Sequence, residues 1–179
     1  MKMKQLLTLA STIVALCGSA TAAGAQDHGD PNAITARVHG TFVDQAGGLG
    51  VLAGDMTVVR FEVRNGAVMA IGAIVGALAD SAGNVLGAVD QELALPIANV
   101  ASTCNQLRMD LGAADAEVLT TLVRFDPEVA GFDSRDGTTP KALAVLCATG
   151  QLLREKPTAD SLARALNDVA VAMAVKVLR

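Results

Sequence analysis

Few side chains in this sequence are arranged for nucleophilic catalysis. A catalytic triad needs a serine or cysteine with a histidine base and an acid, and the 179-residue chain contains only two histidines. His28 lies in a short polar segment and His39 in an alternating pattern typical of a strand, and no serine occupies a Gly-x-Ser-x-Gly turn. The sequence therefore contains no recognisable triad.

Carboxylates are the second set of candidates, and several fall in strand-end or turn-rich positions, among them Asp110, Asp126, Asp133 and Asp136. Two carboxylates brought together by the fold would form a general acid–base pair, as a hydrolase requires. The alternative is that they are solvated loop acids, the usual role of surface aspartates. We favour this second interpretation.

A metal site at a new amino terminus is the third candidate. Cleavage after Ala25 would leave Gln26-Asp27-His28 at the terminus, and its amine, two backbone amides and imidazole form a square-planar nitrogen set that suits Cu(II) or Ni(II). The alternative is a disordered tail whose Gln26 cyclises and loses the amine. Apart from this role for His28, the sequence predicts no cofactor.

The first 25 residues predict a secretory signal peptide of bacterial type. Lys2 and Lys4 precede an apolar stretch over 6–17, and Ala23-Gly24-Ala25 provides a small-residue cleavage site. This stretch is shorter than the about 20 residues that a membrane span needs. We therefore expect a secreted or periplasmic protein, cleaved near Ala25, with no transmembrane segment and a flexible start over 26–32.

The charge balance disfavours two classes of partner. Loss of Lys2 and Lys4 takes the net charge from −4 to −6, and the chain has no Trp and no Tyr. Nucleic acids and anionic membranes attract basic surfaces, and single strands also need aromatic side chains for stacking. We expect neither as a partner.

The cysteines are better suited to structure than to chemistry. Cys17 leaves with the signal peptide, so Cys104 and Cys147 remain. An even pair in an oxidising compartment predicts a disulfide. A redox or metal-binding pair is the alternative, although the two residues are far apart in sequence and no histidine lies near either.

A single β-rich domain over 33–179 is expected to position these residues. Alternation over 33–44 predicts a strand, and the Gly-rich stretch 45–54 predicts a mobile loop or a bulged connection. A meander of three antiparallel strands over 55–96 follows as the centre of the sheet. Its first strand, 57–64, is expected to bury Val59, Phe61 and Val63.

Asn65-Gly66 predicts a two-residue type I′ turn after this strand. Such a turn gives four pairs across the hairpin: Arg64 with Ala67, Val63 with Val68, Phe61 with Ala70 and Val59 with Gly72. The second strand, 67–79, is apolar on both faces, so we expect it to be covered on both, with Gly72 and Gly76 marking a bend or a close approach. The third, 85–95, is expected to stop at Pro96, which cannot donate to a ladder.

The remaining elements are shorter strands and then helices. Strand patterns recur over 104–111, 118–125 and 129–132, although 113–122 also fits a helix. Thr139-Pro140 predicts a helix over 140–154, and Thr158 predicts a second one over 159–178, whose end, 169–178, also alternates like a strand. The fold class is therefore α+β and β-dominated, an antiparallel meander or sandwich-like sheet with two C-terminal helices and one disulfide.

Part of the chain resembles an uncharacterised family of small secreted bacterial proteins. The resembling features lie between about 57 and 153: FEVRNGAVMAIGAIVGALADSAGNVLGAVDQ, the cysteine that opens CNQLRMDLG, and the later AVLC. The chain departs from that pattern at Gly112-Ala-Ala-Asp-Ala-Glu, where such proteins are rich in leucine, aspartate and proline. The resemblance implies a secreted β-rich fold with a disulfide, and it implies no catalytic residue.

These observations leave three functional hypotheses. The first is a secreted, non-enzymatic binding or structural module for an envelope or extracellular protein. The second is a carrier for a small apolar ligand or lipid held between the sheet and the helices. The third is a hydrolase that uses loop carboxylates, and it is disfavoured because the catalytic constellations are missing.

Overall fold

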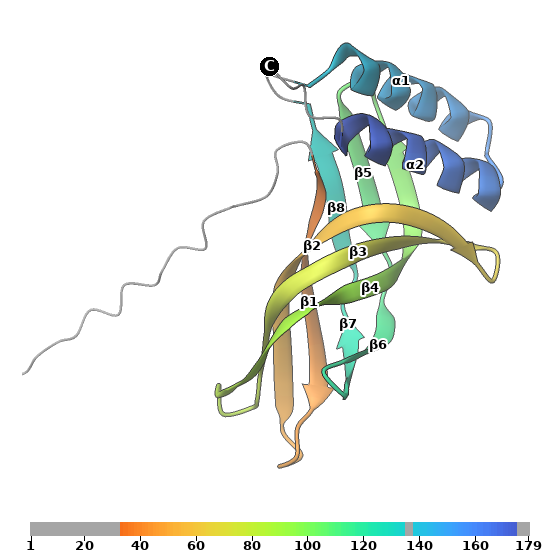
Figure 1. The fold of residues 1–179 in the computed structure, drawn as a ribbon. Coiled ribbons are helices and arrows are strands. Elements are labelled where there is room, and N and C mark those ends of the chain that lie inside the picture. The colour runs from red at the N-terminus through yellow and green to blue at the C-terminus, as the bar shows by residue number, and fades with distance from the viewer. Residues whose placement is uncertain (1–32, 135–137, 175–179) are drawn as a thin grey trace, which may run out of the picture.

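The computed structural model describes residues 33–134 and 138–174. In these ranges eight strands precede two helices, as Figure 1 shows: β1 (Ile34–Val43), β2 (Leu49–Arg64), β3 (Ala67–Ala79), β4 (Val85–Ser102), β5 (Gln106–Leu111), β6 (Ala114–Val118), β7 (Thr121–Phe125), β8 (Glu128–Asp133), α1 (Pro140–Arg154) and α2 (Ala159–Ala174). These strands belong to one antiparallel sheet. The predicted class, a β-dominated α+β fold with two C-terminal helices and a Cys104–Cys147 disulfide, is confirmed.

The sheet curls until its strands meet. Its order is β2-β3-β4-β5-β8-β1-β7-β6, and β1 also pairs with β2. That last ladder runs from Ile34↔Val58 to Val43↔Leu49, while the other side of β1 pairs with β8 and with β7. Alternate side chains therefore point into the curl and form one core. The strand predicted over 33–44 is confirmed, and its inward side chains are buried: Ile34, Ala36, Val38 and Phe42.

The two helices cover one end of the curled sheet, which we call the helix end (Figure 1). Thr139 caps α1 by accepting a hydrogen bond from the Ala142 amide, and Thr158 accepts one from the Ser161 amide before α2. Both caps were predicted. The buried leucines of the helices, Leu146 and Leu166, belong to the core that the strands form. Of the predicted helix 159–178, the structure confirms 159–174, and the rest lies outside the described residues.

A side-chain amide completes the sheet at this end. The β1–β2 ladder stops at Val58, so the edge of β2 beyond it has no strand partner in the described structure. Asn167 of α2 takes that place, since its Oδ1 accepts from the Phe61 N–H and its Nδ2 donates to the Phe61 carbonyl, both at 2.8 Å. Helix α2 is thereby joined to the sheet by hydrogen bonds as well as by packing.

The burial predicted for Val59 is wrong, because a β-bulge shifts the register of β2 at this residue. The Asn65-Gly66 turn is present with positive φ at both residues, and three of the four predicted pairs across it are confirmed. The fourth is wrong, because the register shifts at Val59 and Val58 pairs with Gly72 instead. Val58 is therefore buried and Val59 is exposed.

Three other expectations from the sequence were wrong. Strand β2 begins at Leu49, so 45–54 is a short turn followed by a strand. Strand β4 passes through Pro96 to Ser102, because there it leaves β3 and takes β5 as its partner. Strand β3 is covered on one face only along much of its length, with Val75 exposed on the other.

The predicted close approach at the β3 glycines is confirmed. A Cβ added to Gly72 would lie 2.5 Å from the Thr57 carbonyl oxygen, and one added to Gly76 would lie 2.5 Å from that of Ala53. Side chains at these positions would therefore push β2 and β3 apart.

The last part of the sheet also differs from the expectation in detail. The strand predicted over 118–125 is instead a hairpin of β6 and β7, so the helical alternative for 113–122 is wrong. Its turn residues, Leu119 and Thr120, both have positive φ. Strand β8 covers and extends the short strand predicted at 129–132.

Candidate binding site at the open end of the sheet

Three turns lie at the end of the sheet away from the helices, which we call the hairpin end (Figure 1). They join β1 to β2, β3 to β4 and β6 to β7. The first two turns are tied together, because Asp44 Oδ2 accepts hydrogen bonds from the amide and the hydroxyl of Ser81. In the described structure, both helices lie at the opposite end.

Carboxylates fix the geometry of two of these turns. Hydrogen bonds from the Ser81 hydroxyl and amide, together with those from the amides of Gly48 and Ala46, lower the pKa of Asp44 to about 2. Asp80 acts similarly in its own turn, where hydrogen bonds from Asn84 hold its pKa below the usual value. Both carboxylates are therefore ionised at neutral pH and hold their turns in place.

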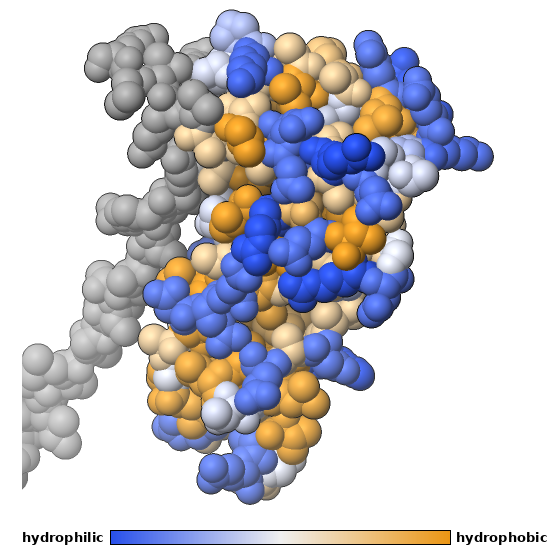
Figure 2. All heavy atoms as spheres, turned by 45° about the vertical axis from the view of Figure 1, so that its right-hand side comes forward, coloured by the Kyte–Doolittle hydropathy of each residue, from blue (hydrophilic) through white to orange (hydrophobic). Residues whose placement is uncertain are grey.

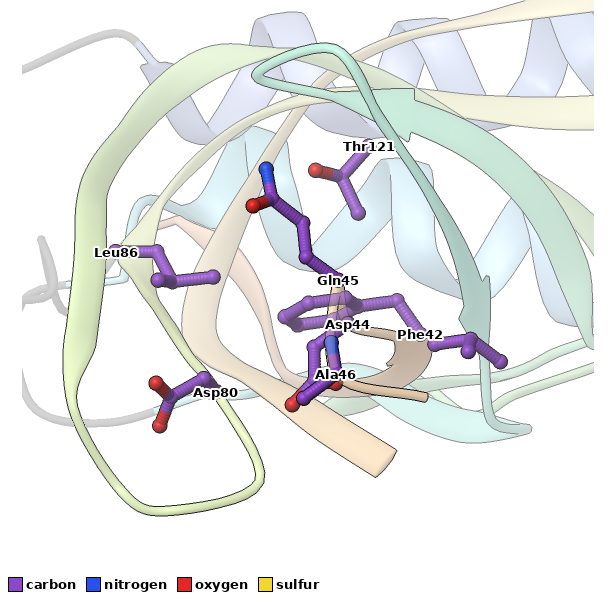
Figure 3. A pocket seen from close by; sticks show the side chains of 8 residues that line it. Phe42, Asp44, Gln45, Ala46, Asp80, Leu86 and Thr121 are labelled. Atoms are coloured by element: carbon purple, nitrogen blue, oxygen red, sulfur yellow. The ribbon is translucent and has the colours of Figure 1, made fainter. Parts of the chain in front are cut away.

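A cavity of about 310 Å³ opens between these turns, and we call it the mouth cavity (Figure 3). It is lined by Phe42, Val43, Asp44, Gln45, Ala46, Asp80, Leu86 and Thr121. The buried Phe42 ring belongs to the core, so the cavity reaches the apolar interior. Its volume lies at the lower end of the about 300–1,000 Å³ that is usual for small-molecule sites.

A second irregularity places Leu86 at this cavity. Leu78 pairs with Gly87, but Ala79 pairs with Val85, so Leu86 is an extra residue in β4. Figure 3 shows the Leu86 side chain directed toward Phe42 across the opening. A bulge redirects a side chain in this way at the rim of a curved sheet.

Large apolar side chains are exposed mainly around this end. Of the eleven that are exposed among the described residues, seven lie on the three hairpins: Val43, Leu49, Val51, Val85, Leu86, Leu119 and Leu122. Val85 is 73% exposed, and Val43 and Leu49 are each 69% exposed. The other four are spread over the sheet and α2: Val59, Val75, Val129 and Val171.

The outer face of the sheet is also apolar near the hairpin end. The registers of β1 to β4 place three neighbouring rows there: Val43–Leu49, Thr41–Val51–Ala79–Val85 and His39–Ala53–Ala77–Ala88. The next row toward the helices, Arg37–Asp55–Val75–Asp90, carries three charged residues and one exposed valine. Figure 2 shows orange surface toward the lower end, interrupted by polar residues, below a band of blue.

Ion pairs hold together a charged band on β2 and β4. Arg60 makes a bidentate contact with Glu92 at 2.6 and 2.8 Å, and its Nε donates to Glu62. Arg64 donates to the same Glu62 carboxylate. These hydrogen bonds lower the pKa of both glutamates, so the band stays charged at neutral pH. The apolar rows of the hairpin end therefore stop at a charged surface.

The residues considered for chemistry are not brought together. His39 is exposed and its Nδ1 lies 2.7 Å from Glu128 Oε1. Asp110 and Asp133 lie near opposite ends of the β5–β8 ladder, and Asp126 is exposed between β7 and β8. Within 33–134 and 138–174, no group of three or more potential metal ligands is present. The remaining candidates, Asp136, His28 and Gln26, lie outside the described residues.

The sequence alone does not predict the residues of this candidate site. The Gly-rich stretch after β1 predicts a loop, and Val85-Leu86 fits the pattern of an ordinary strand. A usable signal was present, because Val85 and Leu86 are adjacent apolar residues directly after a turn and cannot both point inward in a regular strand.

Comparison with known proteins identified no relative: no family model, no curated protein and no solved structure matches the chain. The resemblance to secreted bacterial proteins therefore stays a prediction, as does the signal peptide, which falls outside the described residues. Neither α1 nor α2, the helices of the described ranges, is long and apolar enough to cross a membrane.

Proposed function

We propose that this protein is a non-enzymatic binding module whose binding surface is the hairpin end. The observation that supports this proposal is the gathering of exposed apolar side chains around the open mouth cavity. Contiguous exposed apolar surface is unfavourable in water and typically marks a site where a partner or ligand docks. An apolar group that enters the cavity would contact Phe42 and Leu86 and be removed from water.

A carrier of a small apolar ligand is the second candidate, and the same cavity supports it. The ligand would occupy the mouth cavity rather than a space between the sheet and the helices. The hydrogen-bonded turns at Asp44 and Asp80 favour binding to a preformed opening, since little conformational freedom would be lost there.

A neutral fluorescent dye, Nile red, tests the site. The wild-type protein should enhance its fluorescence, and Leu86→Lys should abolish that enhancement by placing a charge at the cavity. Val171→Lys is the matched control, because Val171 is 63% exposed and Leu86 is 56% exposed, but Val171 lies on α2. An equal loss in both variants, or no loss in Leu86→Lys, would refute the site.

A partner and a small ligand can be separated by native mass spectrometry of the protein isolated from its source. A carrier should retain an apolar molecule, and removing that molecule should lower the melting temperature, because a ligand that binds only the folded state stabilises it. A binding module for a partner protein should show neither effect. Turnover of an ester, peptide or glycoside substrate, abolished by Asp133→Asn, would instead support the hydrolase.

A further inference from the structure

The strand ladder is interrupted on one side of the hairpin end. Strands β4 and β5 pair from Ser102↔Leu107 to Ile97↔Leu111, and one further bond runs from the Gly112 amide to the Pro96 carbonyl. Beyond it, no backbone ladder joins β4 to β6 in the described structure. We call this unpaired stretch, between 85–95 and 114–118, the β4–β6 gap.

Two features of the sequence account for this gap. Pro96 has no N–H and so cannot return the hydrogen bond to Gly112. The inward positions also change from odd-numbered residues such as Leu111 to even-numbered ones such as Val118, so the alternation slips by one residue between β5 and β6. A ladder in register with β5 therefore cannot continue along β6.

Side chains bridge the gap, and few main-chain hydrogen bonds join its far side to β1. Gln91 Nε2 donates to the Glu117 carbonyl oxygen at 2.9 Å, and Leu119 lies over Gly87. The β6–β7 hairpin joins β1 through only two residue pairs. Outward movement of this hairpin would therefore break few main-chain hydrogen bonds and would widen the gap, and the entering segment would have to cover the buried Val118 that the movement uncovers.

The two faces of the gap differ in chemistry. The buried Val89 and Val118 lie on its inner face, together with the small side chain of Ala116. The outward positions of both strands are acidic: Asp90, Glu92, Asp115 and Glu117. Arg60 and Arg124 pair with Glu92 and Asp115, whereas Asp90 and Glu117 form no ion pair within the described residues.

We propose that the β4–β6 gap binds an extended segment of a partner protein in which apolar and basic side chains alternate. The segment pairs with the free edge of β4, where main-chain hydrogen bonds supply affinity and alternate side chains supply specificity. Its apolar side chains point toward Val89 and Val118, and its lysines or arginines face Asp90 and Glu117. This inference rests on the proposed function, because it names the partner of the same end of the sheet.

Fluorescently labelled heptapeptides test the proposal by anisotropy with the full chain. A peptide that alternates valine and lysine should bind, and three controls should not: valine alternating with glutamate, the same valines and lysines in blocks, and the first peptide with alternate amides methylated. Binding of the methylated peptide with equal affinity would overturn strand pairing. Failure of the first peptide to bind would overturn the proposal altogether.

Two variants locate the binding site. Asp90→Asn/Glu117→Gln replaces exposed side chains and should weaken binding about ten-fold, which corresponds to about 1.4 kcal/mol for the loss of the two charge pairs together. Gln91→Cys/Ala116→Cys, joined across the gap by a short bifunctional thiol reagent, should lose peptide binding, while the unreacted variant keeps it. Unchanged affinity in either the charge variant or the linked protein would contradict the proposal.

The same linked protein separates this inference from the proposed function. Nile red should still bind it, because the mouth cavity lies beside the gap and stays open. Loss of peptide binding alone in the linked protein supports both proposals. If the wild-type protein binds the peptide but does not enhance the dye fluorescence, binding in the mouth cavity is refuted and peptide binding in the β4–β6 gap is supported.

Discussion

The two ends of the curled sheet are completed in different ways. At the helix end, α1 and α2 bury Leu146 and Leu166, a disulfide joins α1 to the turn before β5, and Asn167 pairs with the free edge of β2. At the hairpin end, short turns surround a cavity and apolar side chains stay exposed. The helix end is therefore covered and cross-linked, whereas the hairpin end leaves apolar side chains in contact with water.

Of the changes considered, removal of the disulfide at the helix end should lower the stability of the protein most. The bond between Cys104 and Cys147 spans a sequence separation of 43 residues, and the chain-entropy relation gives about 4 kcal/mol for a loop of that size. Cys104→Ala/Cys147→Ala should lower the free energy of unfolding by about that amount in urea titrations. Nile red binding by the folded variant should not change, and its loss would show that the two ends are coupled.

Truncation of Asn167 should have the next largest effect. Asn167→Ala leaves the N–H and carbonyl of Phe61 without their partners at a partly buried edge, so the free energy of unfolding should fall by about 1–3 kcal/mol. Asp168→Ala, at the exposed neighbouring position, is the control and should change it by no more than about 0.5 kcal/mol. Equal effects would mean that the edge of β2 needs no cap.

The two tight turns allow a test with smaller effects on stability, in which a change in one turn should stabilise the protein and a change in the other should destabilise it. Asn65-Gly66 and Leu119-Thr120 both have positive φ, but only the first pair suits that backbone. Leu119→Asn/Thr120→Gly should therefore stabilise the protein by about 1 kcal/mol, and Gly66→Val should destabilise it by a similar amount. Thermal denaturation measures both, and a loss of stability on the first change would indicate that Leu119 contributes more by covering Gly87.

Replacement of Asp44, the carboxylate that holds the first turn, should have the smallest effect on stability, and this effect should depend on pH. The pKa of Asp44 is lowered from 3.8 to about 2, so its stabilisation is complete above the unfolded value and is lost as the pH falls through the folded one. Asp44→Asn should therefore flatten the fall of the urea midpoint between about pH 5 and pH 2. Asp126→Asn is the exposed control, and identical pH profiles for wild type and both variants would contradict the prediction.

Local patterns in the sequence were sufficient to predict much of the helix end. Thr139-Pro140 and Thr158 start helices because their side chains and backbones act within one turn. The disulfide followed from a count of cysteines. The role of Asn167 could not be predicted, since its partner Phe61 lies 106 positions away and alternation says nothing about where a neighbouring strand ends.

The sheet was predicted less well than the helices because its features depend on register. The bulges at Val59 and Leu86 each insert one residue, and a single inserted residue reverses which side chains face inward. The sequence predicts that the strand stops at Pro96, yet a strand that changes partners can contain a proline at the point of exchange. The pairing of β1 with β8 and β7, which closes the curl, joins segments far apart in the sequence and is not specified by a meander pattern.

We propose that ligands bind this protein at the hairpin end, and methyl NMR with a neutral detergent tests this binding site most directly. Decyl maltoside, added below its critical micelle concentration, should shift and broaden the methyl signals of four exposed residues around the mouth: Val43, Leu49, Leu86 and Leu122. The methyls of Val59, Val129 and Val171, which are also exposed, should not respond. Equal perturbation of both groups, or a response confined to the second, would contradict the account.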